Sequence, residues 1–402
     1  MKFKTFTALR HRNFRLFFYG QGISLIGTWM HSLAQGWLVL KLTDSAFYLS
    51  LVQAMGSLPI LFFSLIGGVI ADRSDKKKLL LMTQALSMLL ALALAIIVSL
   101  NVVRPWHVVV FAGLLGVINT FDVPGRQSFI IEMVGREDLM NGIALNSAVF
   151  NGARIIGPSI AGLIIGYVGL EACFYINSAS FLAIIVALLL MRFEAPAIRK
   201  EQRPILKELG EGLAYVRHAP AVSSFIFMVG VTSLLAIPYI ALMPIFARDV
   251  LGIGAKGLGV MMGSAGLGAL AGALTLASLG SIRKKGLVAF VSAFASASAL
   301  LAFSFSRNTP ISLVLLAVVG WGMITQLATV NTMLQNDVPD ELRGRVMSLY
   351  TLVFLGFIPI GNLIVGTLAH YLGTPHAVAL SASFCIIIYA LMLARKRELL
   401  RH

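Results

Sequence analysis

One row of polar side chains lies inside the first long apolar segment of the chain. Gln21, Ser24, Thr28, His31 and Gln35 are spaced by three, four, three and four residues, which places them on one face of an α-helix. Hydrocarbon cannot satisfy polar groups, so we expect this face to line a water-filled cavity or to pack on polar neighbours. An imidazole titrates near neutral pH, which makes His31 a candidate for proton coupling or substrate binding. The alternative is a histidine that is simply hydrogen-bonded within the protein.

Ionisable side chains inside apolar segments form a second group. Asp122 and Arg126 are four residues apart, share a helical face and follow Asn119. Such a pair predicts a gate, with a titrating proton site or a static ion pair as alternatives. Arg154 shares a helical face with Asn151, and a basic residue inside a membrane span is functional by default. We expect Arg154 to pair with an anion or with Asp122, the alternative being a purely structural role.

The second half of the chain offers aromatic and amide groups rather than charges. Tyr239, Trp321 and Asn331 lie in apolar segments and could bind a large amphipathic ligand by stacking and hydrogen bonding. Ordinary helix packing explains each of them equally well.

Composition limits the elements that can hold these residues. Of 402 residues, 58% are hydrophobic and 12% are charged, whereas a soluble chain has about a quarter charged. We find no phosphate-binding Gly-x-x-x-x-Gly-Lys-Ser/Thr loop, and Cys173 and Cys385 predict neither a disulfide framework nor a metal site. The net charge of +15 comes from short loops and indicates membrane topology rather than nucleic-acid binding. We therefore expect an all-α integral membrane protein that is no enzyme and needs no cofactor or metal.

Apolar runs bounded by charges, Pro or Gly predict twelve spanning helices in two six-helix halves. The halves are residues 1–192 and 221–402, joined by a cytoplasmic linker, 193–220, with an amphipathic helix. Of the 32 Lys and Arg, 26 fall on the side of the N-terminus and 5 on the other, so both termini are expected in the cytoplasm. An internal repeat at an offset of 204 residues supports two similar halves. The predicted spans are 14–40, 47–71, 79–100, 107–125, 140–168, 172–192, 221–247, 257–280, 287–305, 311–336, 346–371 and 376–394.

The loop after the second predicted span carries a recognisable motif. Gly68 is followed by Asp72-Arg73 and then by Lys76, and this resembles the signature loop of the major facilitator superfamily. The resemblance implies that Asp72 caps the start of the eleventh helix, and that Lys76 joins a charge relay with acids at the base of the fourth. An anion at a helix N-terminus is favourable. The alternative is that Arg73 and the lysines only anchor the loop to anionic lipid. Asp75 departs from the motif, where the superfamily usually has Gly.

The fifth predicted span carries a glycine-proline pattern. Gly152, Gly157, Pro158 and Gly162 are similar to the motif of facilitator-type antiporters, although Ala161 replaces one glycine of its final pair. Glycines at this spacing let two helices approach closely. The resemblance therefore implies antiport.

The whole chain resembles bacterial major facilitator exporters of the enterobactin and macrolide branch, in residues 121–130, 142–147 and 338–348. The resemblance implies the major facilitator fold, alternating access and proton antiport. It also implies a multi-pass protein of the bacterial inner membrane, monomeric among lipids, that exports a small siderophore- or drug-like molecule. The cavity helices offer no mid-depth acid and Arg154 supplies positive potential, so a neutral or anionic amphipathic cargo is expected. The alternatives are a lysophospholipid flippase of the same fold and a transporter-like sensor.

Overall fold

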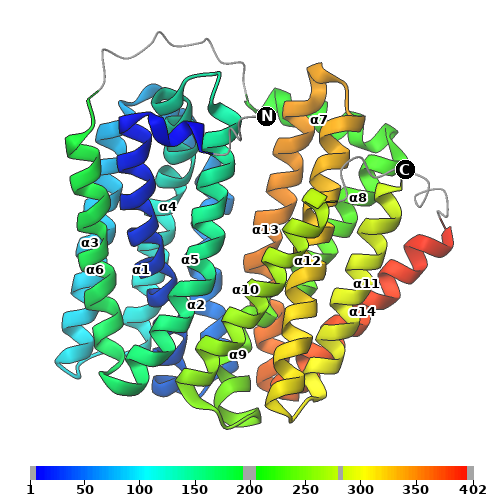
Figure 1. Ribbon diagram of the computed structural model, residues 1–402. Helices are drawn as coiled ribbons and strands as arrows, with labels where there is room; N and C mark the ends of the chain where they lie inside the picture. The colour runs from blue at the N-terminus through cyan, green and yellow to red at the C-terminus, as the bar shows by residue number, and fades with distance from the viewer. Residues whose placement is uncertain (1–5, 193–204, 279–283, 396–402) are drawn as a thin grey trace. The chain divides into compact units, whose positions relative to one another are not determined.

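The computed structural model describes residues 6–192, 205–278 and 284–395, and these are helical almost throughout (Figure 1). Contacts divide the chain into two compact units. One helix, α2 (Ala46–Arg73), contributes to both. Its residues up to Ser57 group with the second unit and those from Leu58 with the first. Pro59, which cannot donate a backbone hydrogen bond, lies directly after that division.

The first unit is built around α1 (Arg12–Thr43), which packs against α4 (Pro105–Val134), α5 (Leu139–Tyr167) and α6 (Leu170–Leu190). A further helix, α3 (Lys76–Ser99), packs on α4 and α6, and the short η1 (Thr7–Arg10) precedes α1. Phe14, Phe17, Phe129 and Leu188 are fully buried in the hydrophobic cluster of this unit. This packing places the polar face of α1 toward α3, α4 and α6.

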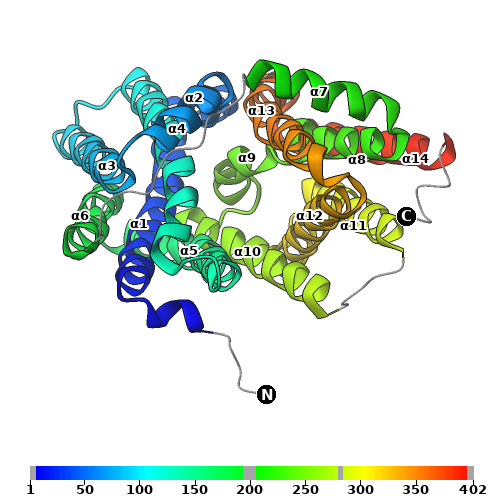
Figure 2. The ribbon, with the colours of Figure 1, turned by 90° about the horizontal axis from the view of Figure 1, so that it is seen from above.

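In the second unit, residues 220–250 form one span whose hydrogen-bond pattern changes along its length. It consists of α8 (Pro220–Val231), the π-helical turn η2 (Thr232–Ala236), α9 (Tyr239–Ile245) and a second π-helical turn, η3 (Phe246–Val250). The remaining long helices are α10 (Gly254–Ser278), α11 (Lys285–Phe305), α12 (Thr309–Asp337), α13 (Asp340–Leu372) and α14 (Thr374–Arg395). The shorter α7 (Ile205–His218) packs on α13 and α8 and lies across the end of the unit (Figure 2).

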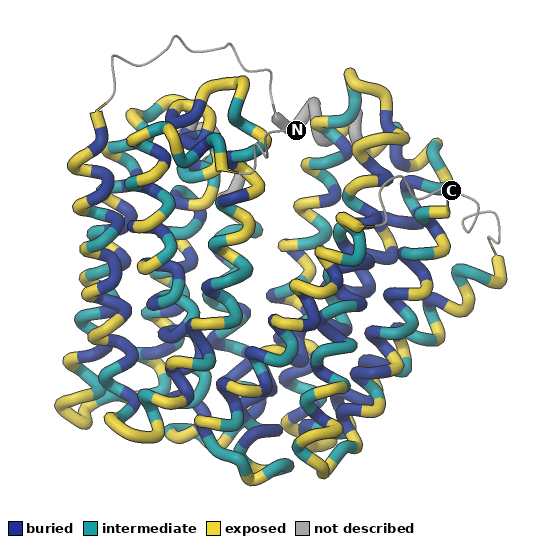
Figure 3. Tube along the Cα trace, viewed as in Figure 1, coloured by how far each residue is buried: buried dark blue, intermediate teal, exposed yellow. Residues whose placement is uncertain are grey.

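Eleven stretches of the described chain are long and apolar enough to cross a membrane. The 32-residue α1 is long enough to be the twelfth element, but its polar side chains lower its hydropathy. Exposed residues occur along the whole length of the helices, and many are large and apolar (Figure 3). Leu86, Leu89, Leu182 and Val186 are examples on α3 and α6. Such surfaces would aggregate in water, and they match the expected lipid-facing surface of a membrane protein.

Most predicted spans match the helices within three residues at each end, but three predictions were wrong. The predicted span 107–125 continues to Val134, because Pro124 is accommodated inside α4 and does not end it. The predicted span 346–371 begins at Asp340, and the span 221–247 contains two π-helical turns rather than one uninterrupted α-helix. In the predicted linker, residues 193–204 lie outside the described residues, and α7 provides the helix expected there.

Glycines at equivalent positions of the internal repeat make equivalent helix contacts. A Cβ at Gly157 of α5 would lie 2.6 Å from the Cβ of Trp29 and 2.8 Å from the carbonyl oxygen of Ile26, both on α1. A Cβ at Gly361 of α13 would overlap the carbonyl oxygen of Leu234 in η2. Each pair joins the first span of a unit to its fifth. The same backbone approach is therefore built twice, as the repeat predicts.

Candidate functional site

The first unit contains a polar cavity between α1, α3, α4 and α6. Its volume is about 60 Å³. Side chains from all four helices line it, so the packing of the bundle creates the cavity. The polar lining residues are Gln21, Ser24, Thr28, His31, Gln84, Ser87, Asn119, Asp122, Arg126 and Asn177.

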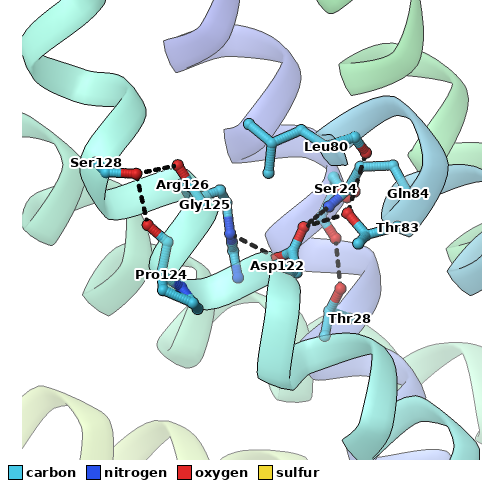
Figure 4. Close-up of polar contacts among 10 residues, drawn as sticks. All are labelled: Ser24, Thr28, Leu80, Thr83, Gln84, Asp122, Pro124, Gly125, Arg126 and Ser128. Atoms are coloured by element: carbon cyan, nitrogen blue, oxygen red, sulfur yellow. Dashed lines mark hydrogen bonds and ion pairs between the residues drawn. The ribbon is translucent and has the colours of Figure 1, made fainter. Parts of the chain in front are cut away.

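The carboxylate of Asp122 is the most highly connected group at this cavity (Figure 4). One oxygen accepts hydrogen bonds from Thr83 Oγ1 at 2.9 Å and from Gln84 Nε2 at 2.7 Å. The other lies 2.7 Å from Arg126 Nε. The side chain of Asp122 is 4% exposed and that of Arg126 is 22% exposed. A buried carboxylate is tolerated only with such partners, because an unpaired charge in the interior costs several kcal/mol.

Local features of α4 explain how Asp122 is positioned. Pro124 lacks an amide hydrogen, so the carbonyl of Thr120, one turn earlier, loses its helical partner. A Cβ at Gly67 of α2 would overlap that carbonyl oxygen, so α2 approaches α4 closely there. Sequence reasoning selected Gly68, but a Cβ at Gly68 would meet no atom within 4 Å. The residue that makes the close contact is therefore the preceding glycine.

His31 and Thr28 complete the cavity side of α1. The hydroxyl of Thr28 donates to the carbonyl of Ser24 at 3.0 Å, one turn back along the helix. His31 is buried, and its ring packs edge-on against Phe174 with centroids 4.9 Å apart. Its Nδ1 has no hydrogen-bond partner. The imidazole therefore presents an unsatisfied nitrogen within a polar cavity.

The motif loop between α2 and α3 makes several contacts to its own unit. Lys76 Nζ contacts a carboxylate oxygen of Glu132 near the end of α4. Lys77 Nζ donates to the carbonyl of Met191 at 2.8 Å, just after α6. Asp75 is the N-cap of α3 and accepts from the amide of Lys78 at 3.1 Å, which gives a physical role to the residue that departs from the motif. The side chain of Asp72 lies outside the described residues.

Near the same end, η1 is anchored to the start of α5. His11 Nε2 lies 2.8 Å from a carboxylate oxygen of Asp138, and the amide of Ala8 donates to Asn141 Oδ1 at 2.9 Å. The hydrogen bond from His11 lowers the pKa of the partly exposed Asp138 carboxyl below its ordinary value. The contact links the N-terminal segment to the loop between α4 and α5.

Other residues singled out in the sequence lie away from this cavity. Gln35 is buried on α1 but is not part of the lining. Asn151 donates to the carbonyl of Ser147 at 2.9 Å on α5, where Arg154 is half-buried. In the second unit, Tyr239 is buried and the indole of Trp321 donates to Thr275 Oγ1 at 3.2 Å. Asn331 accepts from Gln335 Nε2 at 2.6 Å.

The antiporter-type motif divides into residues that pack and one that does not. Gly157, Pro158 and Gly162 are buried on α5, as expected for close helix packing. Gly152 would meet no atom within 4 Å of an added Cβ.

Sequence reasoning missed the α3 and α6 parts of the cavity. Gln84 and Ser87 of α3 and Asn177 of α6 line the cavity and are buried polar residues inside apolar spans. The only signal for these residues in the sequence was a polar side chain inside an apolar span. An amide in the middle of a span needs a partner or water, so it marks a polar site. Spacing could not reveal it, since each helix contributes too few polar residues to form a stripe.

Comparison with known families identifies relatives along the whole chain. A family described as a transmembrane secretion effector matches residues 3–400. The staphyloferrin A transporter of Staphylococcus aureus is 25% identical over 96% of this chain and 97% of that protein. The multidrug efflux pump Tap of Mycolicibacterium fortuitum is 28% identical over 94% of this chain and 93% of that protein. The enterobactin exporter EntS of Escherichia coli K12 is 26% identical over 98% of this chain and 93% of that protein.

Solved structures show the same fold at low sequence identity. A bacterial homologue of the human lysosomal transporter Spinster, inward-facing and occupied, has a TM-score of 0.76 at 11% identity over 96% of each chain. A D-xylose–proton symporter has a TM-score of 0.73 at 10% identity, covering 94% of this chain and 96% of the other. The arrangement of helices is thus that of these transporters.

Proposed function

We propose that this chain, which belongs to the transmembrane secretion effector family of the major facilitator superfamily, exports a small amphipathic molecule across the bacterial inner membrane. The observation that carries this proposal is the match along nearly the full length of two siderophore transporters and a multidrug pump. Two of those relatives are named for efflux or export and the third is named as a transporter, whereas their cargoes differ. The cargo of this chain is therefore of siderophore or drug type.

Transport proceeds by alternating access, and proton antiport drives it. Support comes from a buried carboxylate inside a span, Asp122, whose ion-pair partner Arg126 is partly exposed. Protonation of Asp122 would remove the charge that holds Arg126, and deprotonation would restore the pair. An ionisable group at such a position is rare in a membrane span and marks an ion pathway in many transporters.

The gating residues we propose are Gly68, Asp72, Arg73, Lys76, Asp122 and Arg126. The contact between Lys76 and Glu132 supports this assignment, because it joins the motif loop to the end of α4. A charge pair between two helix ends stabilises one arrangement of those helices and releases another when it breaks. Exchanging Asp72 for Asn should impair transport while leaving folding largely intact, and unaltered turnover would refute the gate.

We assign cargo binding to polar and aromatic residues outside the first-unit cavity. Arg154 supplies positive charge within a span, which favours neutral or anionic cargo over cationic drugs. If quaternary ammonium compounds were the best substrates, this assignment would be wrong. The residues proposed are Gln35, Asn151, Arg154, Tyr239, Trp321 and Asn331.

Topology follows from the distribution of basic residues. The bias of 26 Lys and Arg against 5 places both termini and the linker 193–220 in the cytoplasm. The halves 1–192 and 221–402 act as the two moving bodies. The protein works as a monomer among membrane lipids, and its basic charge contacts lipid headgroups rather than nucleic acid.

A screen with inside-out membrane vesicles tests the export function. Vesicles from cells with and without the chain are offered siderophores, macrolides and cationic dyes, each with an acidic lumen and again after an ionophore collapses the pH gradient. Gradient-dependent uptake of one class, seen only with the chain, supports export. Uptake of lysophospholipid alone would instead indicate a flippase.

A further inference from the structure

A basic cleft lies in the first unit, where the start of α1 meets the end of α6. Its volume is about 530 Å³, and it shares no lining residue with the polar cavity around Asp122. None of the residues assigned to gating or to cargo lines it, so it is a separate feature of the molecule. The residues that line the basic cleft are His11, Arg12, Asn13, Met133 and Arg192.

Hydrogen bonds between side chains and backbone join the two helix ends at this cleft. Arg12 Nη1 donates to the carbonyl of Leu190, the last residue of α6, at 3.1 Å. The amide of Asn13 binds the backbone of Arg192 twice, because its Nδ2 donates to the carbonyl at 2.7 Å and its Oδ1 accepts from the backbone N–H at 3.3 Å. The backbone of Arg192 is therefore fixed beside the first turn of α1, and both arginines belong to one cleft.

The cleft carries an excess of positive charge. Arg12 and Arg192 are both exposed, and neither guanidinium forms an ion pair within the part of the chain that the structure describes. The carboxylate of Asp138 is bound to His11 at 2.8 Å, so it has a partner of its own. A guanidinium has five N–H donors in a planar fork that matches phosphate. The cleft is therefore suited to a phosphate group that bridges the two arginines.

Exposed apolar side chains on the same two helices indicate the source of that phosphate. Val186 and Leu189, within two turns of the end of α6, are 50% and 60% exposed. Tyr19 lies two turns into α1 from Arg12, on the same helical face, and is 60% exposed. Tyrosine is enriched where a membrane meets water, and exposed apolar surface beside it suits acyl chains. A phospholipid can use both the cleft and these side chains, whereas free phosphate can use only the cleft.

We propose that the basic cleft binds one anionic phospholipid of the cytoplasmic leaflet, with its phosphate between the guanidiniums of Arg12 and Arg192 and its acyl chains along the exposed faces of α1 and α6. The choice of leaflet rests on the topology proposed above. Basic loops in general attract anionic lipid, whereas this is one site of fixed position. It requires neither cargo nor an ion gradient, so it goes beyond the export function.

The net charge of the headgroup decides which phospholipid fits best. A phosphodiester carries one negative charge, and the two arginines carry two positive charges. An ammonium on the same headgroup would be repelled by the guanidiniums. Phosphatidylglycerol has no ammonium, and its hydroxyls suit a polar lining. It is therefore expected to bind more tightly than phosphatidylethanolamine or phosphatidylcholine.

Native mass spectrometry of the purified, delipidated protein tests the site without any cargo. The three phospholipids, with identical acyl chains, are titrated separately, and the dissociation constant of the first bound lipid is measured for each. A basic residue near a lipid surface contributes about fivefold in affinity for an anionic lipid. Phosphatidylglycerol should therefore bind as one saturable copy, about tenfold more tightly than phosphatidylcholine. Equal affinities for the three lipids would overturn the proposal.

Variants of the two arginines assign the preference to the cleft. Arg192→Gln should weaken phosphatidylglycerol binding about fivefold, and the double variant with Arg12→Gln about twenty-fivefold. Arg12→Lys and Arg192→Lys keep the charge and should retain most of the affinity, which separates loss of charge from loss of the bond to Leu190. Arg395→Gln is the matched control, because Arg395 is an exposed arginine at the end of α14, outside the cleft. An equal loss in this control would show general attraction to basic charge and would overturn the site.

Soluble competitors distinguish a lipid site from a site for a free anion. Inorganic phosphate and glycerophosphoglycerol, the headgroup without acyl chains, are added in large excess over phosphatidylglycerol. The lipid should stay bound, because its chains contribute to the affinity. Displacement by either competitor would overturn the proposal in favour of a soluble anion. The vesicle screen measures export separately, so a negative result here leaves the proposed function standing.

Discussion

The carboxylate of Asp122 lies 2.7 Å from Nε of Arg126, one turn further along α4, and the two side chains differ sharply in exposure. The acid is 4% exposed and the base 22%. The pair therefore connects the interior of the first unit to its surface. A change of charge on the buried acid therefore acts directly on a base that is partly exposed.

A double-mutant cycle on this pair measures how strongly it is coupled. Asp122→Asn should destabilise the protein by about 3 kcal/mol, because it leaves the guanidinium without its carboxylate in a mostly buried position. Arg126→Gln should destabilise the protein by a similar amount, because it leaves the buried carboxylate without its guanidinium. The double variant should be more stable than the sum of the single effects predicts.

Apparent melting temperature in detergent is a convenient readout for that cycle. Cys173 and Cys385 are buried free thiols, so a thiol-reactive dye reports unfolding directly. Strictly additive losses would show that the pair is not coupled and would contradict its proposed role in gating.

The contact between Lys76 and Glu132 should matter for transport more than for stability. The carboxylate of Glu132 is 40% exposed, and ion pairs near the surface are worth about 0–1 kcal/mol. Lys76→Glu and Glu132→Lys should therefore each lower transport several-fold with little change in melting temperature. The charge-swapped double variant should recover part of the rate. If the swap recovers nothing, while each single change abolishes transport, the two residues act separately.

Gly157 and Gly152 give a matched pair on α5. Gly157→Val should reduce folded yield strongly, because its side chain would collide with Trp29 and with the backbone of α1. Gly152→Val should be tolerated, since a Cβ there meets no atom within 4 Å. The two variants are compared by their purified yield and by their monodispersity in size-exclusion chromatography. Equal losses for both variants would mean that helix propensity, rather than the α1–α5 contact, sets the requirement.

A hydrogen-bonded cluster in the second unit supports the first π-helical turn. The hydroxyls of Thr232 and Tyr389 lie 2.7 Å apart, and Gln326 Nε2 donates to Thr232 Oγ1 at 2.7 Å. Tyr389→Phe should therefore cost about 1 kcal/mol and lower the melting temperature. Tyr371→Phe, at a tyrosine that is 79% exposed, is the control and should have no effect. An equal shift in both would refute a role for the cluster.

Apolar runs bounded by charges were enough to predict most of the helices, and the arrangement of helices agrees with solved transporter structures. The superfamily was predicted from the resemblance of the motif loop, and that prediction is confirmed. The π-helical turns at Thr232–Ala236 and Phe246–Val250 were not predicted, because periodicity does not distinguish a single π-helical turn from the α-helix around it. The extension of α4 past Pro124 also escaped prediction. A single proline is tolerated where a neighbouring helix such as α2 approaches the freed carbonyl.

The candidate site was only partly predictable for a related reason. The stripe on α1 identified Gln21, Thr28 and His31, since several polar residues on one helix define a face. Gln84 and Asn177 lie on other helices, and their place at the cavity depends on how α3, α4 and α6 pack. Packing between helices also decided that Gly67, rather than Gly68, contacts α4. The spacing of residues along one helix does not predict contacts between different helices.

Transport by purified protein in proteoliposomes, under an imposed pH gradient, tests proton-driven export through Asp122 most directly. The cargo is the best compound from the vesicle screen. Wild type should accumulate it against its gradient when protons flow in the opposite direction. Asp122→Asn should retain exchange of cargo at equilibrium and lose accumulation. Accumulation by Asp122→Asn at the wild-type level, or wild-type transport that ignores the pH gradient, would contradict the account.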